Sequence, residues 1–435
     1  MKQVNTVNRD ILRIAVPSII SNITVPLLGL VDTAIVGHLG SASYIGAIAV
    51  GGMLFSMIYW IFGFLRMGTG GLTAQAYGSK DMPECSRTLA RSAGVSLIIA
   101  LTLIVLQVPI RMIAFMLIDA SQEVRQYAST YFHICIWGAP AALGLYSFTG
   151  WFIGMQNSRF PMIIAISQNI INIAASLLFV FGLGMKVEGV ALGTLIAQYS
   201  GLIMAIVLWS RKYASLSKNM NLRRTMDRTS MIRFFHVNRD IFLRTLCLVA
   251  VTVFFTSTGA AYGDIVLAVN TLMMQLFTLF SYVMDGFAYA GEALVGKNIG
   301  AGDKTALHET IRSLYVWGIG MATLFTLLYL LGGKGFLALL TDDAQVIDAS
   351  AKYFYWAVAI PFASFLAFLM DGFCVGATAT SLMLRAMFTA AVTFFIVYFS
   401  LRSQMGNHSL WLAFISYLAV RGIVQTLSFR KLKTM

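Results

Sequence analysis

The chain has few charged residues, and this scarcity decides its class. Only 11% of its 435 residues are Asp, Glu, Lys or Arg, whereas 58% are hydrophobic and the mean hydropathy is +0.78. A water-soluble core cannot bury so much apolar surface, so most of that surface must face lipid. The composition therefore predicts a polytopic membrane protein, with the lipid bilayer as its main partner.

Cysteine and histidine are also scarce. The four cysteines are scattered without a CxxC spacing, which predicts neither a disulfide nor a metal site. No HExxH motif, nucleophile elbow or P-loop is present, and the five histidines fall at the ends of apolar runs or in loops. We therefore expect no enzyme, no cofactor and no metal. Without an ATP-binding motif, any energy-driven transport across the membrane would have to draw on an ion gradient or on the substrate's own gradient.

The apolar runs are continuous rather than alternating, and each is about as long as a helix needs to cross a bilayer. Lipid-exposed backbone permits only helices or closed barrels, so this pattern predicts helices. We predict an all-α integral membrane protein with twelve transmembrane helices. Their expected ranges are 12–36, 44–66, 89–113, 127–150, 160–183, 189–210, 240–258, 264–295, 306–331, 350–376, 380–400 and 408–428.

The second half of the chain repeats the first at a nearly fixed offset. The repeated elements are Asn8-Arg9-Asp10-Ile11 with Asn238-Arg239-Asp240-Ile241, Gly78 to Asp81 with Gly300 to Asp303, Pro140 with Pro361, and Gly154 with Gly376. They predict two six-helix bundles related by an internal repeat, at 1–210 and 239–435. Two homologous bundles can enclose a cleft and rock against each other, which is the basis of alternating access.

Basic residues gather in the loops on one side of the predicted membrane. The positive-inside rule then places both termini in the cytoplasm, and we expect a multi-pass protein of the cytoplasmic membrane. The net charge of +13 is a topology signal, so no nucleic-acid partner is expected. The basic stretch 211–238 forms a cytoplasmic linker, either simply solvated or regulatory.

Four segments resemble the MATE family of multidrug and toxic-compound exporters, and the last resembles its DinF-like branch. They are Pro17 with Gly29 to Gly40 (GLVDTAIVGHLG), Phe179 to Gly184 (FVFGLG), Val187 to Thr194 (VEGVALGT), and Met284 to Gly296 (MDGFAYAGEALVG). The resemblance covers essentially the whole chain. It implies a secondary active exporter of small molecules, which we expect to work as a monomer.

The resemblance also implies that Asn172 in the fifth helix takes part in ion coupling with Asp32. Where the family often has an acid in that helix, this chain has Ser176, and the seventh helix carries no acid in Thr252 to Thr258. We therefore expect coupling to H⁺ rather than Na⁺. A Na⁺-coupled exporter of the same fold stays open. So does a lipid-linked precursor flippase, although such a flippase would need a cleft rich in Arg or Lys.

Asp32 is the clearest candidate for ion coupling, because a carboxylate within a transmembrane span is costly and usually functional. Ser18 and Ser21 share its face of the first helix, which predicts a polar stripe toward a central cleft. Pro26 lies between them and makes the helix bendable, as does Pro17. Burial disfavours the charged form of a carboxylate, so we expect Asp32 to exchange a proton and alter this bend. Alternatively, Asp32 is permanently hydrogen-bonded between helices.

Three further acids lie in the C-terminal half. Asp285 and Glu292 are seven residues apart on one face of the eighth helix, with Tyr289 between them, and Asp371 lies in the tenth helix. We expect these residues to line a cleft that attracts amphipathic cations, although Glu292 could instead pair with a nearby lysine. Arg421 is a candidate partner for one of the C-terminal acids.

Overall fold

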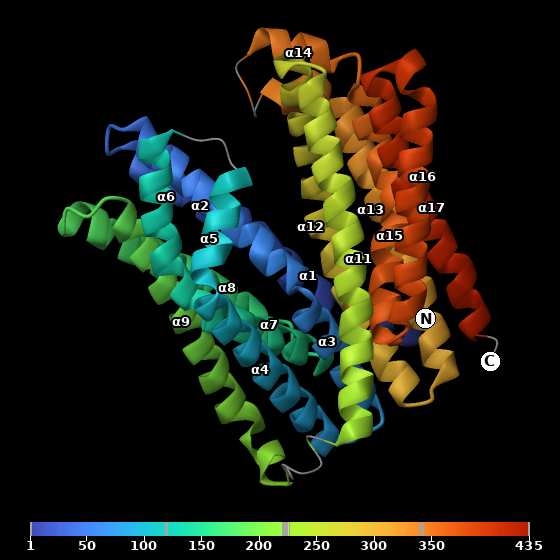
Figure 1. The fold of residues 1–435 in the computed structure, drawn as a ribbon. Helices are drawn as coiled ribbons and strands as arrows, with labels where there is room; N and C mark the ends of the chain where they lie inside the picture. The colour runs from blue at the N-terminus through green and yellow to red at the C-terminus, as the bar shows by residue number, and fades with distance from the viewer. Residues whose placement is uncertain are drawn as a thin grey trace. The chain divides into compact units, whose positions relative to one another are not determined.

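The computed structural model describes residues 2–117, 121–219, 225, 227–338, 341 and 343–433, and its elements are helices joined by short turns (Figure 1). Arg223 and Arg224 of the predicted linker lie outside these residues. The helices are α1 (Lys2–Gly37), α2 (Ala42–Ile61), α3 (Phe64–Gly78), α4 (Met82–Val105), α5 (Gln107–Leu117), α6 (Gln122–Cys135), η1 (Ile136–Gly138), α7 (Ala139–Gly154), α8 (Arg159–Leu177), η2 (Leu178–Gly182), α9 (Val187–Tyr213), η3 (Ala214–Asn219), α11 (Arg228–Ala261), α12 (Asp264–Gly300), α13 (Lys304–Ala338), α14 (Ala344–Ser350), α15 (Phe354–Gly376), α16 (Thr380–Met405) and α17 (Asn407–Lys433).

The predicted all-α membrane fold is confirmed. Among the described residues, eleven helical stretches are long and apolar enough to cross a membrane. The remaining predicted span, 127–150, is formed by α6, η1 and α7, with the short 3₁₀ turn η1 interrupting it. Pro140 stands directly after this turn, in the first turn of α7. Proline lacks an amide hydrogen, so it is tolerated at a helix start but interrupts a helix that runs through it.

Contacts between residues divide the chain into two units: unit 1 comprises 1–19 and 236–435, and unit 2 comprises 20–235. The chain passes from one unit to the other within α1, after Ile19, and within α11, after Phe235. The N-terminal half of α1 therefore packs with the helices of the second half of the sequence. The predicted limits at 210 and 239 stay a prediction, because part of the linker lies outside the described residues.

Each unit is built around one central helix. In unit 2, α7 packs against α3, α4 and α9, while α8 packs against α9. In unit 1, α15 packs against α12, α13 and α17, and α16 packs against α17. Both chain termini lie in unit 1, at the end away from α14 (Figure 1).

Matching glycines allow the central helix of each unit to approach a neighbouring backbone closely. A Cβ atom at Gly150 of α7 would collide with the carbonyl oxygen of Arg66 in α3, and one at Gly372 of α15 would collide with that of Ala288 in α12. Gly154 and Gly376, one turn further along, make the same kind of approach to the same two helices. This small-xxx-small pattern lets membrane helices pack backbone to backbone. The internal repeat is therefore a repeat of helix packing as well as of sequence.

The turns of the two halves repeat as well. Lys80 and Gly302 close equivalent turns with φ angles of 61° and 69°, and Gln156 and Thr378 do so with 61° and 53°. This left-handed region is costly for residues with a side chain, apart from Asn and Asp. Three of the four positions hold such a residue, so the surrounding helix packing fixes the turn geometry.

The glycine contacts lead to a first prediction. Gly372→Ala and Gly150→Ala should each lower the free energy of unfolding by about 1–3 kcal/mol, because the added methyl group meets backbone that cannot rotate away. Gly320→Ala in α13 and Gly94→Ala in α4 are matched controls, since a Cβ at either position meets nothing within 4 Å. Thermal unfolding of the four purified variants in detergent measures the difference. Similar melting temperatures for all four would contradict the proposed close packing.

Candidate functional site

Asp32 lies in the part of α1 that belongs to unit 2. It is only 5% exposed, and its Oδ1 atom is buried without a hydrogen-bond partner among the described residues. Ser18, on the predicted polar stripe, belongs to unit 1 and donates its hydroxyl to the carbonyl oxygen of Ile14 at 2.8 Å. The stripe is thus divided between the units, with Ser18 in unit 1 and Ser21 and Asp32 in unit 2. The Ser18 hydroxyl donates its hydrogen bond within α1.

The surroundings of Asp32 come from three other helices. Its carboxylate interacts electrostatically with Tyr131 and Cys135 of α6. Tyr131 hydrogen-bonds Thr194 of α9, and the Nδ2 atom of Asn172 in α8 donates to the Thr194 hydroxyl at 3.1 Å. The structure therefore connects the two predicted ion-coupling residues, Asp32 and Asn172, through Tyr131 and Thr194.

Two more polar atoms in this region lack partners. The Oδ1 atom of Asn172 and the hydroxyl of Ser176, one turn further along α8, are buried without a hydrogen bond to any described residue. Both side chains are fully buried. Buried polar groups are nearly always satisfied in proteins, and exceptions often mark a site for a proton, a water molecule or an ion. A protonated Asp32 would bring one additional hydrogen-bond donor to a region that has unpaired acceptors.

Asp371 in unit 1 has the opposite environment. One of its carboxylate oxygens binds both Arg244 of α11 and Arg421 of α17, the latter at 3.0 Å, and the other accepts a hydrogen bond from Gln425 at 2.7 Å. The Arg421 guanidinium also lies over the ring of Phe368, 5.7 Å from its centre. All of these polar side chains are largely buried, so Asp371 is a fully paired charge inside the unit.

These contacts show which partners the charged residues of the C-terminal half have. Arg421 is a candidate partner for a C-terminal acid in the sequence, and the structure pairs it with Asp371. Arg244 was missed, although an arginine inside an apolar run is a signal that sequence reasoning could have used. The buried charges of this half are mainly acidic, because Asp240, Glu292 and Asp371 are all buried. Arg244 and Arg421 neutralise the last of these carboxylates.

The α12 residues lie near this cluster. Asp285 is half-buried and interacts electrostatically with Arg421, which also binds Asp371. Tyr289, half-buried, and Glu292, 1% exposed, follow at one and two turns along α12. The structure thus brings together Asp285 and Asp371 within unit 1, and Asp32 and Asn172 within unit 2.

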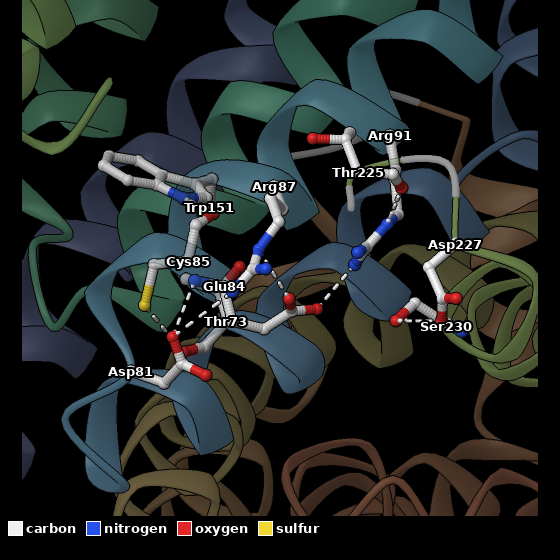
Figure 2. Close-up of polar contacts among 10 residues, drawn as sticks. All are labelled: Thr73, Asp81, Glu84, Cys85, Arg87, Arg91, Trp151, Thr225, Asp227 and Ser230. Carbon is white, nitrogen blue, oxygen red and sulfur yellow. Dashed lines mark hydrogen bonds and ion pairs between the residues drawn. The ribbon is translucent and has the colours of Figure 1, made fainter. Parts of the chain in front are cut away.

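A third polar cluster anchors the linker to unit 2 (Figure 2). Arg91 of α4 is 5% exposed; it pairs with Glu84 at 2.5 Å and donates to the carbonyl oxygen of Thr225 at 2.6 Å. Arg87 pairs with the same Glu84 at 3.0 Å, and Asp81 caps the start of α4. Arg91 therefore fixes one residue of the linker directly, and Arg87 supports it through the shared partner Glu84.

Comparison with known proteins gives the family. A MatE family model matches residues 17–178 and 241–399, one segment in each half of the chain. The chain belongs to the MATE family of multidrug efflux transporters. The predicted resemblance, including the DinF-like branch, is confirmed by 38% identity to the DNA damage-inducible protein F of Escherichia coli over 94% of this chain and 89% of that protein.

Other MATE relatives are more distant. The multidrug export protein MepA of Staphylococcus haemolyticus is 22% identical over 79% of this chain and 75% of its own length. The fold matches a MATE crystal structure in the bent conformation, with a TM-score of 0.87 and 19% identity over 100% of this chain and 98% of that one. The same score and identity hold for a structure in the straight conformation, over 98% and 96%. This MATE transporter therefore has the twelve-helix fold with two six-helix halves.

The contrast between the two acids leads to a second prediction. Asp371→Asn should lower the free energy of unfolding by about 3 kcal/mol or more, because it removes the carboxylate that pairs with the buried guanidiniums of both Arg244 and Arg421. Asp32→Asn should change it by less than about 1 kcal/mol, since no paired charge is lost. Thermal unfolding of the purified variants at neutral pH compares them. A larger loss for Asp32→Asn would mean that Asp32 is a structural ion-pair member.

Proposed function

We propose that this MATE transporter exports amphipathic small molecules by alternating access, driven by H⁺ antiport at Asp32. The main support is the buried Asp32 carboxylate, which has an unpaired oxygen and no cationic partner among the described residues. A buried unpaired charge is costly, so this carboxyl group should gain a proton when its site is closed to water and lose it when water enters. Tyr131, Thr194 and Asn172 would position the group.

The conformational step would be carried by α1. Pro26 lies between Asp32 and the point after Ile19 where the chain passes into unit 1. Proline removes one backbone hydrogen bond and weakens the helix locally. A change in the bonding of Asp32 could therefore bend α1 at Pro26, with Pro17 as a second flexible point, and affect both units through one covalent helix. Two MATE structures with the same fold are described as bent and as straight, so more than one conformation is known for this fold.

Other aspects of the function are also proposals. We place the protein in the bacterial cytoplasmic membrane as a functional monomer, with both termini in the cytoplasm. The acids Asp285 and Glu292, with Tyr289, are proposed to attract cationic substrates. Asp371 is less suited to this role than its sequence position implies, because two arginines already neutralise its carboxylate.

Two alternatives remain for comparison. A Na⁺-coupled exporter would need several oxygen ligands around Asp32, and Asn172 and Ser176 supply no second negative charge. A lipid-linked precursor flippase would need free guanidiniums to bind a diphosphate. Arg244 and Arg421 place two guanidiniums inside unit 1, which is a feature that such a flippase would need. Both arginines are bound to Asp371, however, so proton-coupled export is the better-supported proposal.

The coupling proposal predicts that Asp32→Asn abolishes H⁺-driven export, with at least a tenfold loss of initial rate. Asp32→Glu keeps a titratable group and should retain a measurable part of the rate. Transport is measured in proteoliposomes under an imposed pH gradient, and separately under a Na⁺ gradient at fixed pH. Normal export by Asp32→Asn, or a wild-type rate that follows only the Na⁺ gradient, would overturn the assignment.

The substrate proposal predicts a selective effect of Asp285→Asn. Export of a cationic compound should show an apparent affinity about tenfold weaker, because a desolvated charge pair contributes more than about 1 kcal/mol. A neutral compound of similar size should be affected less than about twofold. Glu292→Gln serves as the second variant. Equal losses for both compounds would show that these acids act in coupling or folding and not in substrate attraction.

A further inference from the structure

The buried carboxylate of Asp371 is already occupied by cations that belong to the protein. Arg244 and Arg421 both bind the same carboxylate oxygen, and Gln425 donates to the other. A guanidinium is always protonated at physiological pH, so these partners do not leave by titration. Any mobile cation approaching Asp371 would have to displace a tethered one.

The charges around this carboxylate are balanced. Arg244 and Arg421 carry two positive charges, and both bind the Asp371 carboxylate. The second negative charge is that of Asp285, which interacts electrostatically with Arg421. Removing the charge of Arg244 alone would leave one unit of negative charge inside unit 1. In a low-dielectric interior such an excess is costly, and one monovalent cation would neutralise it.

Oxygen atoms that could hold such a cation are present. The Oε1 atom of Gln425 is buried and has no hydrogen-bond donor among the described residues. The hydroxyl of Tyr417 lies beside Arg421, to which it is hydrogen-bonded. Together with the Asp371 carboxylate these atoms are the oxygen ligands that hard cations prefer. The Arg244 guanidinium already binds the carboxylate oxygen that such an ion would use.

We infer that Arg244 is a specificity-determining residue whose guanidinium takes the place of a bound cation at Asp371 and so keeps Na⁺ out of unit 1. The inference rests on the proposed function only in that it explains why coupling would be confined to Asp32. It also gives Arg244 a role that a purely structural ion pair would not have. Loss of Arg244 should create Na⁺ binding, whereas loss of a structural pair only destabilises.

The test measures Na⁺ binding directly on purified full-length protein in detergent. Melting temperatures are compared in NaCl and in choline chloride at equal ionic strength. We expect no Na⁺-specific difference for the wild type and a Na⁺-specific rise of about 2 °C or more for Arg244→Ala. Arg244→Lys, which keeps a tethered cation, should behave as the wild type. The double variant Arg244→Ala with Asp371→Asn restores the charge balance and should show no rise.

Several outcomes would overturn the inference. A Na⁺-specific rise in the melting temperature of the wild type that is absent from the charge-balanced double variant would show that Arg244 does not exclude the ion. If folded Arg244→Ala shows no Na⁺-specific rise in its melting temperature, the cluster binds no ion even without the Arg244 guanidinium. A rise that persists in the double variant would place the ion elsewhere. If Arg244→Ala does not fold, Arg244→Gln keeps a hydrogen-bond donor without the charge and is judged in the same way.

The two proposals fail independently in these experiments. The melting measurements involve no gradient and no substrate, so they do not depend on H⁺ antiport. Conversely, normal H⁺-driven export by Asp32→Asn would reject the coupling proposal whatever Na⁺ does to Arg244→Ala.

Discussion

A charge inside the hydrocarbon layer must be paired or neutralised, and the two units meet this requirement in different ways. In unit 1, Asp371 is held by Arg244 of α11 and by Arg421 and Gln425 of α17. In unit 2, Asp32 has no such partner among the described residues, and the polar atoms near it include acceptors to which no described residue donates. A paired carboxylate is fixed in one state, whereas an unpaired one can alternate between two. The coupling role proposed for Asp32 rests on this difference.

The backbone has kept its repeat while the charged side chains have diverged. Gly150 and Gly372 bring their helices equally close to a neighbour, and the turns at Lys80 and Gly302 have the same geometry. These features determine how six helices pack, and any change in them affects the whole unit. Charged residues are less constrained by the packing. Each half could therefore acquire its own polar cluster on a common framework.

The sequence predicts the fold well because the physical basis of this fold is simple. Long apolar runs must be helices in lipid, and a repeat at a fixed offset must produce two similar bundles. The candidate site is only partly predictable. Asp32, Asn172 and Arg421 stand out as single residues, but Tyr131 and Thr194 become important only where α6 and α9 meet. A helical wheel places Ser18 and Asp32 on one face, yet it cannot show that the two ends of α1 pack in different units.

The passage of α1 from unit 1 into unit 2 also affects how the protein folds during synthesis. The N-terminal half of α1 is synthesised first, but the helices that it packs against, from residue 236 onward, are synthesised last. At a synthesis rate of about 5–20 residues per second, this segment waits roughly 10–40 s in the membrane for its partners. Ile11, Ile14 and Ala15, buried in the finished protein, must face lipid or the insertion machinery during that time. Their apolar character therefore serves the nascent chain as well as the folded transporter.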